Sequence, residues 1–236
     1  QLNKRPGTTR LHSISGIVII IIDEDDINTM MTATMSMLSE QQLHSVCRSL
    51  VDHGYVPVIY RQQALSLSST ATRSQLRKVV QYLSSRYPQM PLAMVASSLS
   101  ASLLVSYLGE FGSSTLVHAA IAVSPIWKSH VNPLADADDI AIPLLVVHYD
   151  DDPVVPSSTV PRDLFTLYPH LLLVTCPIGG HCGQIQSTPL IDLILIDFLS
   201  AVIRFNNHHQ RQNNLITRPS VRMPPNKLYS RISTAT

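Results

Sequence analysis

The sequence has few charged residues and no apolar run long enough to cross a membrane. Only 14% of its 236 residues are charged, and the formal net charge is +1. The longest uninterrupted apolar run is Ile17–Ile22, well short of the ~20 residues that a spanning helix needs. No signal peptide is visible, but the chain begins at Gln1 rather than Met, so an anchor upstream stays open. The small net charge gives no argument for a nucleic-acid partner.

Cysteine is scarce as well. The three cysteines, Cys47, Cys176 and Cys182, are odd in number and lack the paired spacing of a metal site. This pattern argues against a secreted domain built on disulfides and favours buried or free thiols. His208 and His209 are adjacent but have no further ligand beside them, which makes a poor metal site. The sequence therefore implies no metal and no organic cofactor.

Acidic residues are missing from the end of the chain. None follows Asp197, whereas six basic residues do: Arg204, Arg211, Arg218, Arg222, Lys227 and Arg231. Basic, polar segments of this kind cannot bury enough apolar surface to order themselves. We predict three parts: an N-terminal extension over 1–15, one domain over 16–205, and a basic polar tail over 206–236 that is disordered.

Strand patterns and helix patterns alternate through the middle of the chain. The run over 16–22 is continuous and β-branched, which is typical of a strand buried on both faces. We expect six strands, over 16–22, 56–61, 92–96, 115–123, 140–148 and 171–176. We expect five helices, over 43–51, 76–83, 99–108, 158–167 and 190–205. This alternation predicts an α/β domain with a mostly parallel sheet and helices on both faces.

Three loops that leave the carboxyl ends of expected strands carry residues suited to catalysis. Ser98 lies in a strand-to-helix turn, Asp152 follows a buried strand, and His181 lies among glycines after the last strand. Each alone also fits an ordinary turn, a solvated acidic loop or an exposed histidine. Together, in this order, they are typical of the α/β-hydrolase fold, in which a serine, an acid and a histidine act as nucleophile, orienting group and base.

The residues around this set leave alternatives open. The turn has Ala96 and Ser100 where a G-x-S-x-G turn has glycines; both are small enough for the close approach of strand and helix. Ser97 and Ser100 are rival nucleophiles, although strand alternation turns Ser97 away and Ser100 falls inside the first helical turn. Asp151 is a rival for the acid.

The segment Ser98–Glu110 resembles the nucleophile turn and following helix of the YheT-like (AB hydrolase 4) branch of the α/β-hydrolase superfamily, usually written S-L-G-G-N-x-L-x-x-Y-L-G-E. Within that branch the chain resembles the abhydrolase domain-containing 15 group most. The matching segments are 111–114, 124–125, 133–136, 151–153 and 179–183. The resemblance covers about residues 16–205. It implies Ser98 as nucleophile, His181 as base, and Asp152 as acid, because the acid of this pattern directly precedes a proline.

The chain departs from the branch in two further places. The loop after the first strand reads Asp23-Glu-Asp-Asp26, where the branch has His-Gly and an apolar residue. We expect the backbone N–H groups of Leu99 and Asp25 to form the oxyanion hole, with carboxylates close to the developing charge. Only 18 residues, Ile126–Pro143, stand where the branch inserts a long lid. We therefore expect the lid to be short or absent.

Two hypotheses about function follow. In the first, the chain is a serine hydrolase of carboxylic esters, and the resemblance implies acyl lipids as substrates. In the second, it is a catalytically impaired hydrolase fold that acts as a regulatory or scaffolding protein partner in lipid metabolism. The resemblance also implies a membrane-associated or secreted protein, bound peripherally or by an upstream anchor. Neither hypothesis involves nucleic acid.

Overall fold

The computed structural model describes residues 14–23, 40–62, 70–127, 136–183 and 190–216. In these residues six strands form one sheet in the order β2-β1-β3-β4-β5-β6, and all neighbouring strands are parallel. The strands are β1 (Gly16–Asp23), β2 (Tyr55–Gln62), β3 (Leu92–Ser97), β4 (Ala119–Val123), β5 (Leu144–Tyr149) and β6 (Leu171–Cys176). The parallel sheet predicted from the sequence is confirmed.

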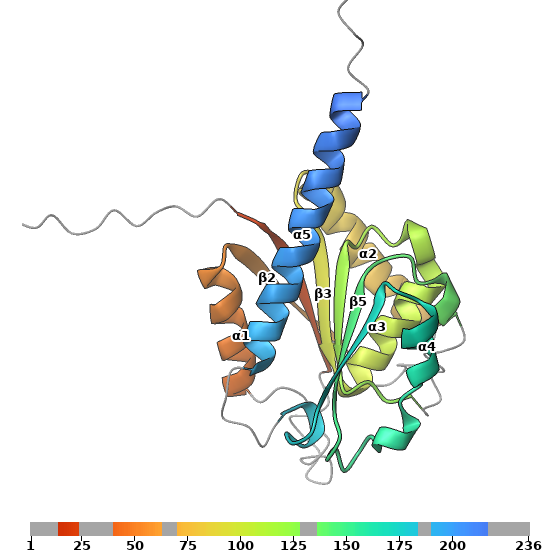
Figure 1. Cartoon of the computed structure of the whole chain (residues 1–236). Coiled ribbons are helices and arrows are strands. Elements are labelled where there is room, and N and C mark those ends of the chain that lie inside the picture. The colour runs from red at the N-terminus through yellow and green to blue at the C-terminus, as the bar shows by residue number, and fades with distance from the viewer. Residues whose placement is uncertain (1–13, 24–39, 63–69, 128–135, 184–189, 217–236) are drawn as a thin grey trace, which may run out of the picture. The chain divides into compact units, whose positions relative to one another are not determined.

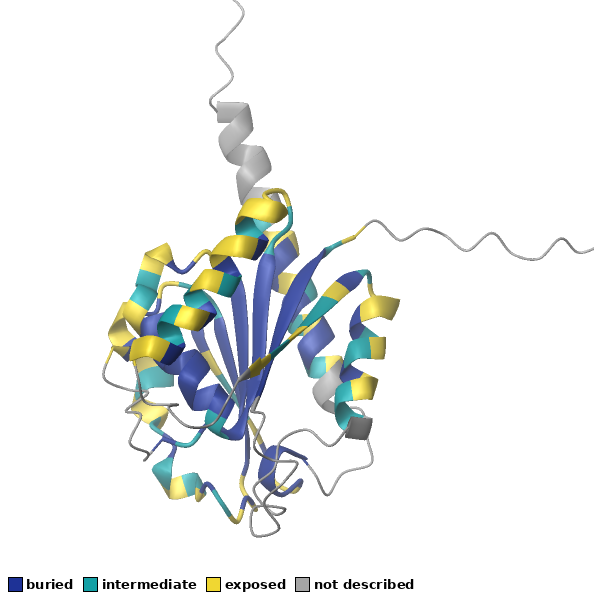
Figure 2. Ribbon diagram, turned by 180° about the vertical axis from the view of Figure 1, so that it is seen from behind, coloured by how far each residue is buried: buried dark blue, intermediate teal, exposed yellow. Residues whose placement is uncertain are grey.

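Helices cover both faces of the sheet (Figure 1). They are α1 (Glu40–Asp52), α2 (Thr70–Arg86), α3 (Ser98–Phe111), α4 (Arg162–Leu167) and α5 (Leu190–Ile216). Alternate residues of β1 explain its continuous apolar run. Ile17, Ile19 and Ile21 pack with buried residues of α2 and α3, whereas Val18 and Ile20 pack with buried residues of α1 and α5. Figure 2 shows the central strands buried along their length.

The strand order reverses direction between β1 and β3. The chain passes from β1 outward to β2 and then returns to the other side of β1 to form β3. In open parallel sheets, ligands bind beyond the carboxyl ends of the strands at such a reversal. Ser98 directly follows the carboxyl end of β3. The topology alone therefore places this serine at the favoured binding position.

The connection from β4 to β5 covers residues 124–143 and holds no long insertion. Its start is fixed on α3 by Ser102, whose hydroxyl donates to the carbonyl of Ile126 (2.9 Å) and accepts from its N–H (2.8 Å). Near its end the connection passes so close to α3 that a Cβ on Gly109 would lie 2.5 Å from the Asp136 carbonyl oxygen. Gly109 and Asp136, which belong to two different motif segments of the resemblance, thus lie side by side.

Some predicted boundaries are wrong. Instead of one helix over 158–167, the chain forms a short 3-10 turn (Ser157–Thr159) and α4, because Pro161 between them has no N–H to continue a helix. β4 begins at Ala119 rather than 115, after a residue with positive φ, Leu116.

The last helix is also longer than predicted. α5 ends at Ile216 instead of residue 205, so residues 206–216, assigned to a disordered tail, are helical. Between the start of α5 at Leu190 and Pro219 there is no glycine or proline to end the helix, and its Gln and Arg residues are good helix formers. The rest of the predicted tail, 217–236, and residues 1–13 of the predicted extension lie outside the described residues. No helix among the described residues has the length and apolarity needed to cross a bilayer.

Candidate active site

The turn from β3 to α3 holds Ser98 in an unusual backbone conformation. Its φ is +53°, a region that non-glycine residues seldom occupy and that concentrates at functional sites. A serine placed in this way on a sharp strand-to-helix turn is the defining feature of a nucleophile elbow. Ala96 and Ser100, which replace the two glycines, are fully buried, so small side chains fit the tight packing of the turn.

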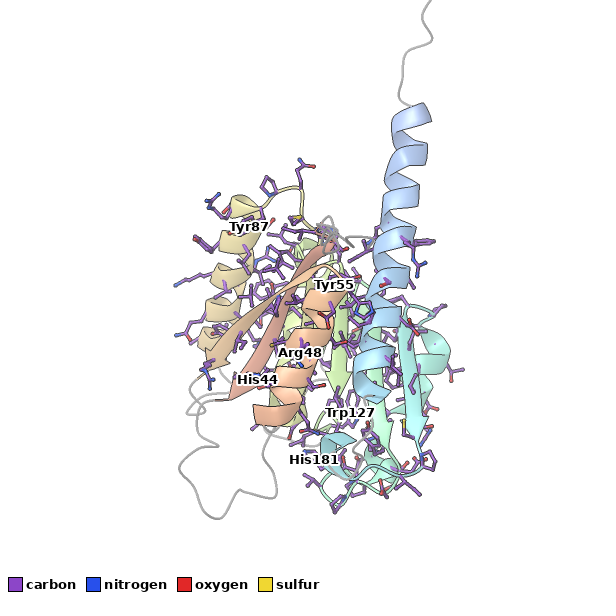
Figure 3. All side chains as sticks on the ribbon, turned by 90° about the vertical axis from the view of Figure 1, so that its left-hand side faces the viewer. His44, Arg48, Tyr55, Tyr87, Trp127 and His181 are labelled. Carbon is purple, nitrogen blue, oxygen red and sulfur yellow. The ribbon has the colours of Figure 1, made fainter. Side chains whose placement is uncertain are left out.

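The structure brings Ser98, His181 and Asp152 together although 83 residues separate Ser98 from His181. The Nε2 atom of His181 lies 2.8 Å from Ser98 Oγ. Its Nδ1 atom lies 2.8 Å from one carboxylate oxygen of Asp152 and 3.0 Å from the other. All three residues are at most 5% exposed. Figure 3 shows His181 on the turn after β6 (the short 3-10 turn His181–Gly183), at the lower end of the sheet in that view.

The environment of Asp152 favours its ionised form. Burial by itself would raise the pKa of the carboxyl group, but three hydrogen bonds outweigh it and lower the pKa. Besides His181, the N–H groups of Val154 (2.8 Å) and Val155 (2.9 Å) donate to Asp152 Oδ1. A carboxylate held in this way orients the imidazole and stabilises its protonated form. Chemically, the arrangement can take a proton from Ser98 and return it to a leaving group.

Comparison with solved structures identifies the fold. The esterase Pf2001 of Pyrococcus furiosus matches with a TM-score of 0.63 at 17% identity, over 80% of this chain and 84% of the esterase. XC6422 of Xanthomonas campestris, described as an α/β serine hydrolase without a lid, matches with a TM-score of 0.56 at 18% identity, over 81% and 83% of the two chains. This chain has the α/β-hydrolase fold.

Sequence comparison finds a curated relative but no matching family model. The relative is Protein ABHD15 of Homo sapiens, which is 25% identical in a match that covers 61% of this chain and 48% of the relative. The chain therefore spans about half the length of that protein. The match agrees with the group that the sequence motifs indicated. The expectation of a short connection in place of a lid also agrees with the lidless structural neighbour.

The three consecutive aspartates of this hydrolase fold have different partners. Asp150 accepts a hydrogen bond from the Ser157 hydroxyl (2.8 Å) and lies 3.6 Å from Arg162 in an exposed ion pair. Asp151 is turned away from His181 and accepts from the backbone of the glycine-rich loop. Only Asp152 contacts the imidazole. The geometry thus separates the two candidate acids.

The rival serines lie elsewhere. The hydroxyls of Ser97 and Ser100 are buried and have no hydrogen-bond partner among the described residues. His181 Nε2 instead meets Ser98.

One of the two expected oxyanion donors can be located. Leu99 is the second residue of α3, so its N–H has no partner within the helix and lies next to the nucleophile. Asp25 and its neighbours Glu24 and Asp26 lie outside the described residues, whereas Asp23, which was expected in the loop, is the last residue of β1. Among the described residues there is no cluster of three or more His, Cys, Asp or Glu that could hold a metal ion.

Two residues near the site were missed by the sequence reasoning. Ser124, at the carboxyl end of β4, has a φ of +46° and accepts the N–H of Cys182 at 3.2 Å. His148, in β5, is fully buried, and neither ring nitrogen has a partner among the described residues. Burial lowers the pKa of His148, although nearby Asp152 and Asp150 oppose this shift. Two signals were available: both residues lie at the carboxyl ends of strands, and Ser124 belongs to the matching segment 124–125.

Proposed function

We propose that the chain is a serine hydrolase of carboxylic esters. The observation that carries the proposal is the unbroken series of contacts from Ser98 Oγ through His181 to Asp152, on a turn that holds Ser98 at positive φ. A strained backbone costs free energy and concentrates at functional sites. An ordinary serine-rich turn needs neither this conformation nor a buried histidine against a carboxylate. The esterases among the structural neighbours support the same reaction class.

The reaction follows from the atoms in place. His181 Nε2 accepts the Ser98 proton as Oγ attacks the ester carbonyl carbon, and the carbonyl oxygen becomes an oxyanion beside the Leu99 N–H. Collapse of this intermediate breaks the ester C–O bond, and the imidazolium returns the proton to the departing alcohol. Water, deprotonated by the same imidazole, then attacks the acyl-enzyme and releases the acid and Ser98. Asp152 keeps the imidazole in the required tautomer throughout.

Acyl lipids are the substrate class that we propose, on the basis of the resemblance to the YheT-like branch. The short connection over 124–143 carries no large lid domain to cover the site. An ester should therefore reach Ser98 without a large domain movement. A series of esters with different acyl chain lengths reports the acyl preference.

The test is hydrolysis of p-nitrophenyl esters with acyl chains of two to sixteen carbons. The unmodified chain should hydrolyse them, with an optimum at longer chains if the substrate is a lipid. Ser98→Ala should abolish turnover, while Ser97→Ala and Ser100→Ala, the matched serines on either side, should retain it. Equal activity in Ser98→Ala and the unmodified chain would disprove the proposal.

The acidic loop after β1 favours a second candidate, a catalytically impaired hydrolase fold that serves as a protein partner. β1 pairs with β3 in the register Ile21↔Ala96, so β1 ends at Asp23 near the carboxyl end of β3, and three further acidic residues, 24–26, follow Asp23 in the sequence. A carboxylate ~5 Å from the oxyanion at an effective dielectric of ~20 costs roughly 3 kcal/mol. This equals the loss of about one oxyanion donor.

The two candidates predict different behaviour of Ser98→Ala in cells. The partner hypothesis expects this variant to fold normally and to keep both its cellular role and its captured partner. Loss of the cellular role at unchanged stability would favour the hydrolase.

A further inference from the structure

The loop that carries His181 is held in place by hydrogen bonds of its backbone N–H groups as well as by the buried Cys182 side chain. Its N–H groups have defined acceptors. Those of Gly179 and Gly180 donate to Asp151, that of Cys182 donates to Ser124 Oγ, and that of Gly183 donates to the Gly180 carbonyl (3.3 Å). Buried backbone N–H groups need such acceptors, because leaving them unpaired is costly. The position of His181 therefore depends on what holds these groups.

Asp151 supplies two of the acceptors with a single side chain. One carboxylate oxygen lies 2.8 Å from the Gly180 nitrogen and the other lies 3.1 Å from the Gly179 nitrogen. Both glycines are buried, and Gly180 has a φ of +66°, so two successive N–H groups point to one anion, as in a backbone nest. These hydrogen bonds, that of Gly180 first, lower the pKa of Asp151. The carboxylate is thus held ionised on the loop.

The aspartate loop is itself fixed to the sheet. The Asp150 N–H donates to the Cys176 carbonyl (2.8 Å) and the Asp152 N–H donates to the Tyr149 carbonyl (3.1 Å). Asp151 stands between these two fixed points, beside the acid that contacts the imidazole. The segment after β5 therefore holds Gly179 and Gly180, the two residues directly before His181, through the Asp151 side chain.

We propose that Asp151 is a positioning residue, which holds the backbone of residues 179 and 180 so that the His181 imidazole stays between Ser98 and Asp152. The two adjacent aspartates then have separate roles, since Asp152 orients the ring and Asp151 orients the loop that bears it. This role rests on the proposed hydrolase function for its catalytic consequence. The hydrogen bonds by which Asp151 holds the loop do not depend on that function, and they can be measured without turnover.

The test compares Asp151→Ala and Asp151→Asn with Asp150→Asn, which alters the neighbouring aspartate without touching the loop. The first readout is amide hydrogen exchange over residues 178–183. Exchange at Gly179 and Gly180 should rise at least ~10-fold in Asp151→Ala and less in Asp151→Asn, which keeps one acceptor oxygen. The second readout is the rate at which a fluorophosphonate modifies Ser98, which should fall ~10–100-fold in Asp151→Ala because a displacement of about 1 Å is that costly.

Each outcome decides a separate point. Unchanged amide exchange at Gly179 and Gly180 in Asp151→Ala would show that Asp151 does not hold the loop. Faster exchange with an unchanged labelling rate of Ser98 would show that the loop is held but that this does not position His181. If the unmodified chain is not labelled, both the hydrolase proposal and the positioning role of Asp151 are wrong. The hydrogen exchange still tests whether Asp151 holds the backbone of residues 179 and 180. Should Asp151→Ala not fold, Asp151→Asn carries both readouts. Asp150→Asn should match the unmodified chain in exchange and labelling.

Discussion

Gly179 gives a steric test of how precisely the His181 loop must sit. A Cβ added at Gly179 would lie 2.1 Å from Cδ1 and 2.2 Å from Cε1 of Tyr149. Gly179 is not among the residues with positive φ, so Gly179→Ala brings a clash without backbone strain. Tyr149 is buried at the end of β5 and cannot swing into solvent. The loop, the ring or both must move.

The size of the effect follows from the overlap. The 2.1 Å approach is ~1.4 Å short of an ordinary carbon–carbon contact of about 3.5 Å. Overpacking of this kind costs about 1–3 kcal/mol, which lowers the melting temperature by roughly 2–12 °C for a chain of this size. If the loop takes most of the movement, His181 shifts by about 1 Å and the reaction at Ser98 slows ~100-fold. The loss of reactivity should therefore exceed the loss of folded protein.

The assay is the rate of fluorophosphonate labelling of Ser98 together with a thermal unfolding curve on each variant. Tyr149→Leu alone and the double variant Gly179→Ala with Tyr149→Leu complete a cycle, because the shorter leucine can turn away from the new methyl group. The double variant should label faster than Gly179→Ala. The reasoning is refuted if Gly179→Ala labels at the normal rate, or if Tyr149→Leu gives no relief in a folded protein.

Three further predictions concern the acid and the packing of α3. Asp152→Asn should slow labelling of Ser98 by roughly 10²–10⁴-fold with a near-native circular dichroism spectrum; normal labelling would exclude Asp152 as the acid. Because its folded-state pKa is lowered, Asp152 stabilises the fold above about pH 4 and loses this contribution as the pH falls through the lowered pKa. Urea midpoints measured from pH 6 to 2 should therefore fall less steeply in Asp152→Asn than in the unmodified chain, and equal slopes would contradict this. Ser102→Ala leaves both backbone groups of Ile126 without their partner and should cost about 1–3 kcal/mol in urea unfolding, whereas Ser100→Ala, whose hydroxyl has no described partner, should cost less.

Much of the fold could be predicted because hydrophobic burial dominates it. The run Ile17–Ile22 is buried on both sides, and such a run has few other structural solutions. The errors in the predicted helix boundaries have local causes, namely the presence or absence of residues that interrupt a helix. Pro161 split a helix that periodicity alone made continuous, and the absence of glycine or proline let α5 run on to Ile216.

The candidate site was predictable only in part. The positions of Ser98, Asp152 and His181 at strand ends fixed which loops meet, but not which atoms touch. The separate partners of Asp151 and Asp152 depend on backbone N–H directions in the loop after β6, which no sequence pattern encodes. The contact of Tyr149 with Gly179 likewise joins residues from different strand ends, and it emerges only once β5 and β6 are paired in register.

The most direct test of the central claim is to treat the folded, unmodified chain with a fluorophosphonate and to map the adduct by peptide mass spectrometry. We expect one covalent adduct, on Ser98, that disappears in Ser98→Ala and slows strongly in a His181→Ala variant that remains folded. Ser97→Ala and Ser100→Ala should label as the unmodified chain does. No adduct on folded protein, or an adduct on Ser97 or Ser100, would contradict the assignment of Ser98 as the nucleophile.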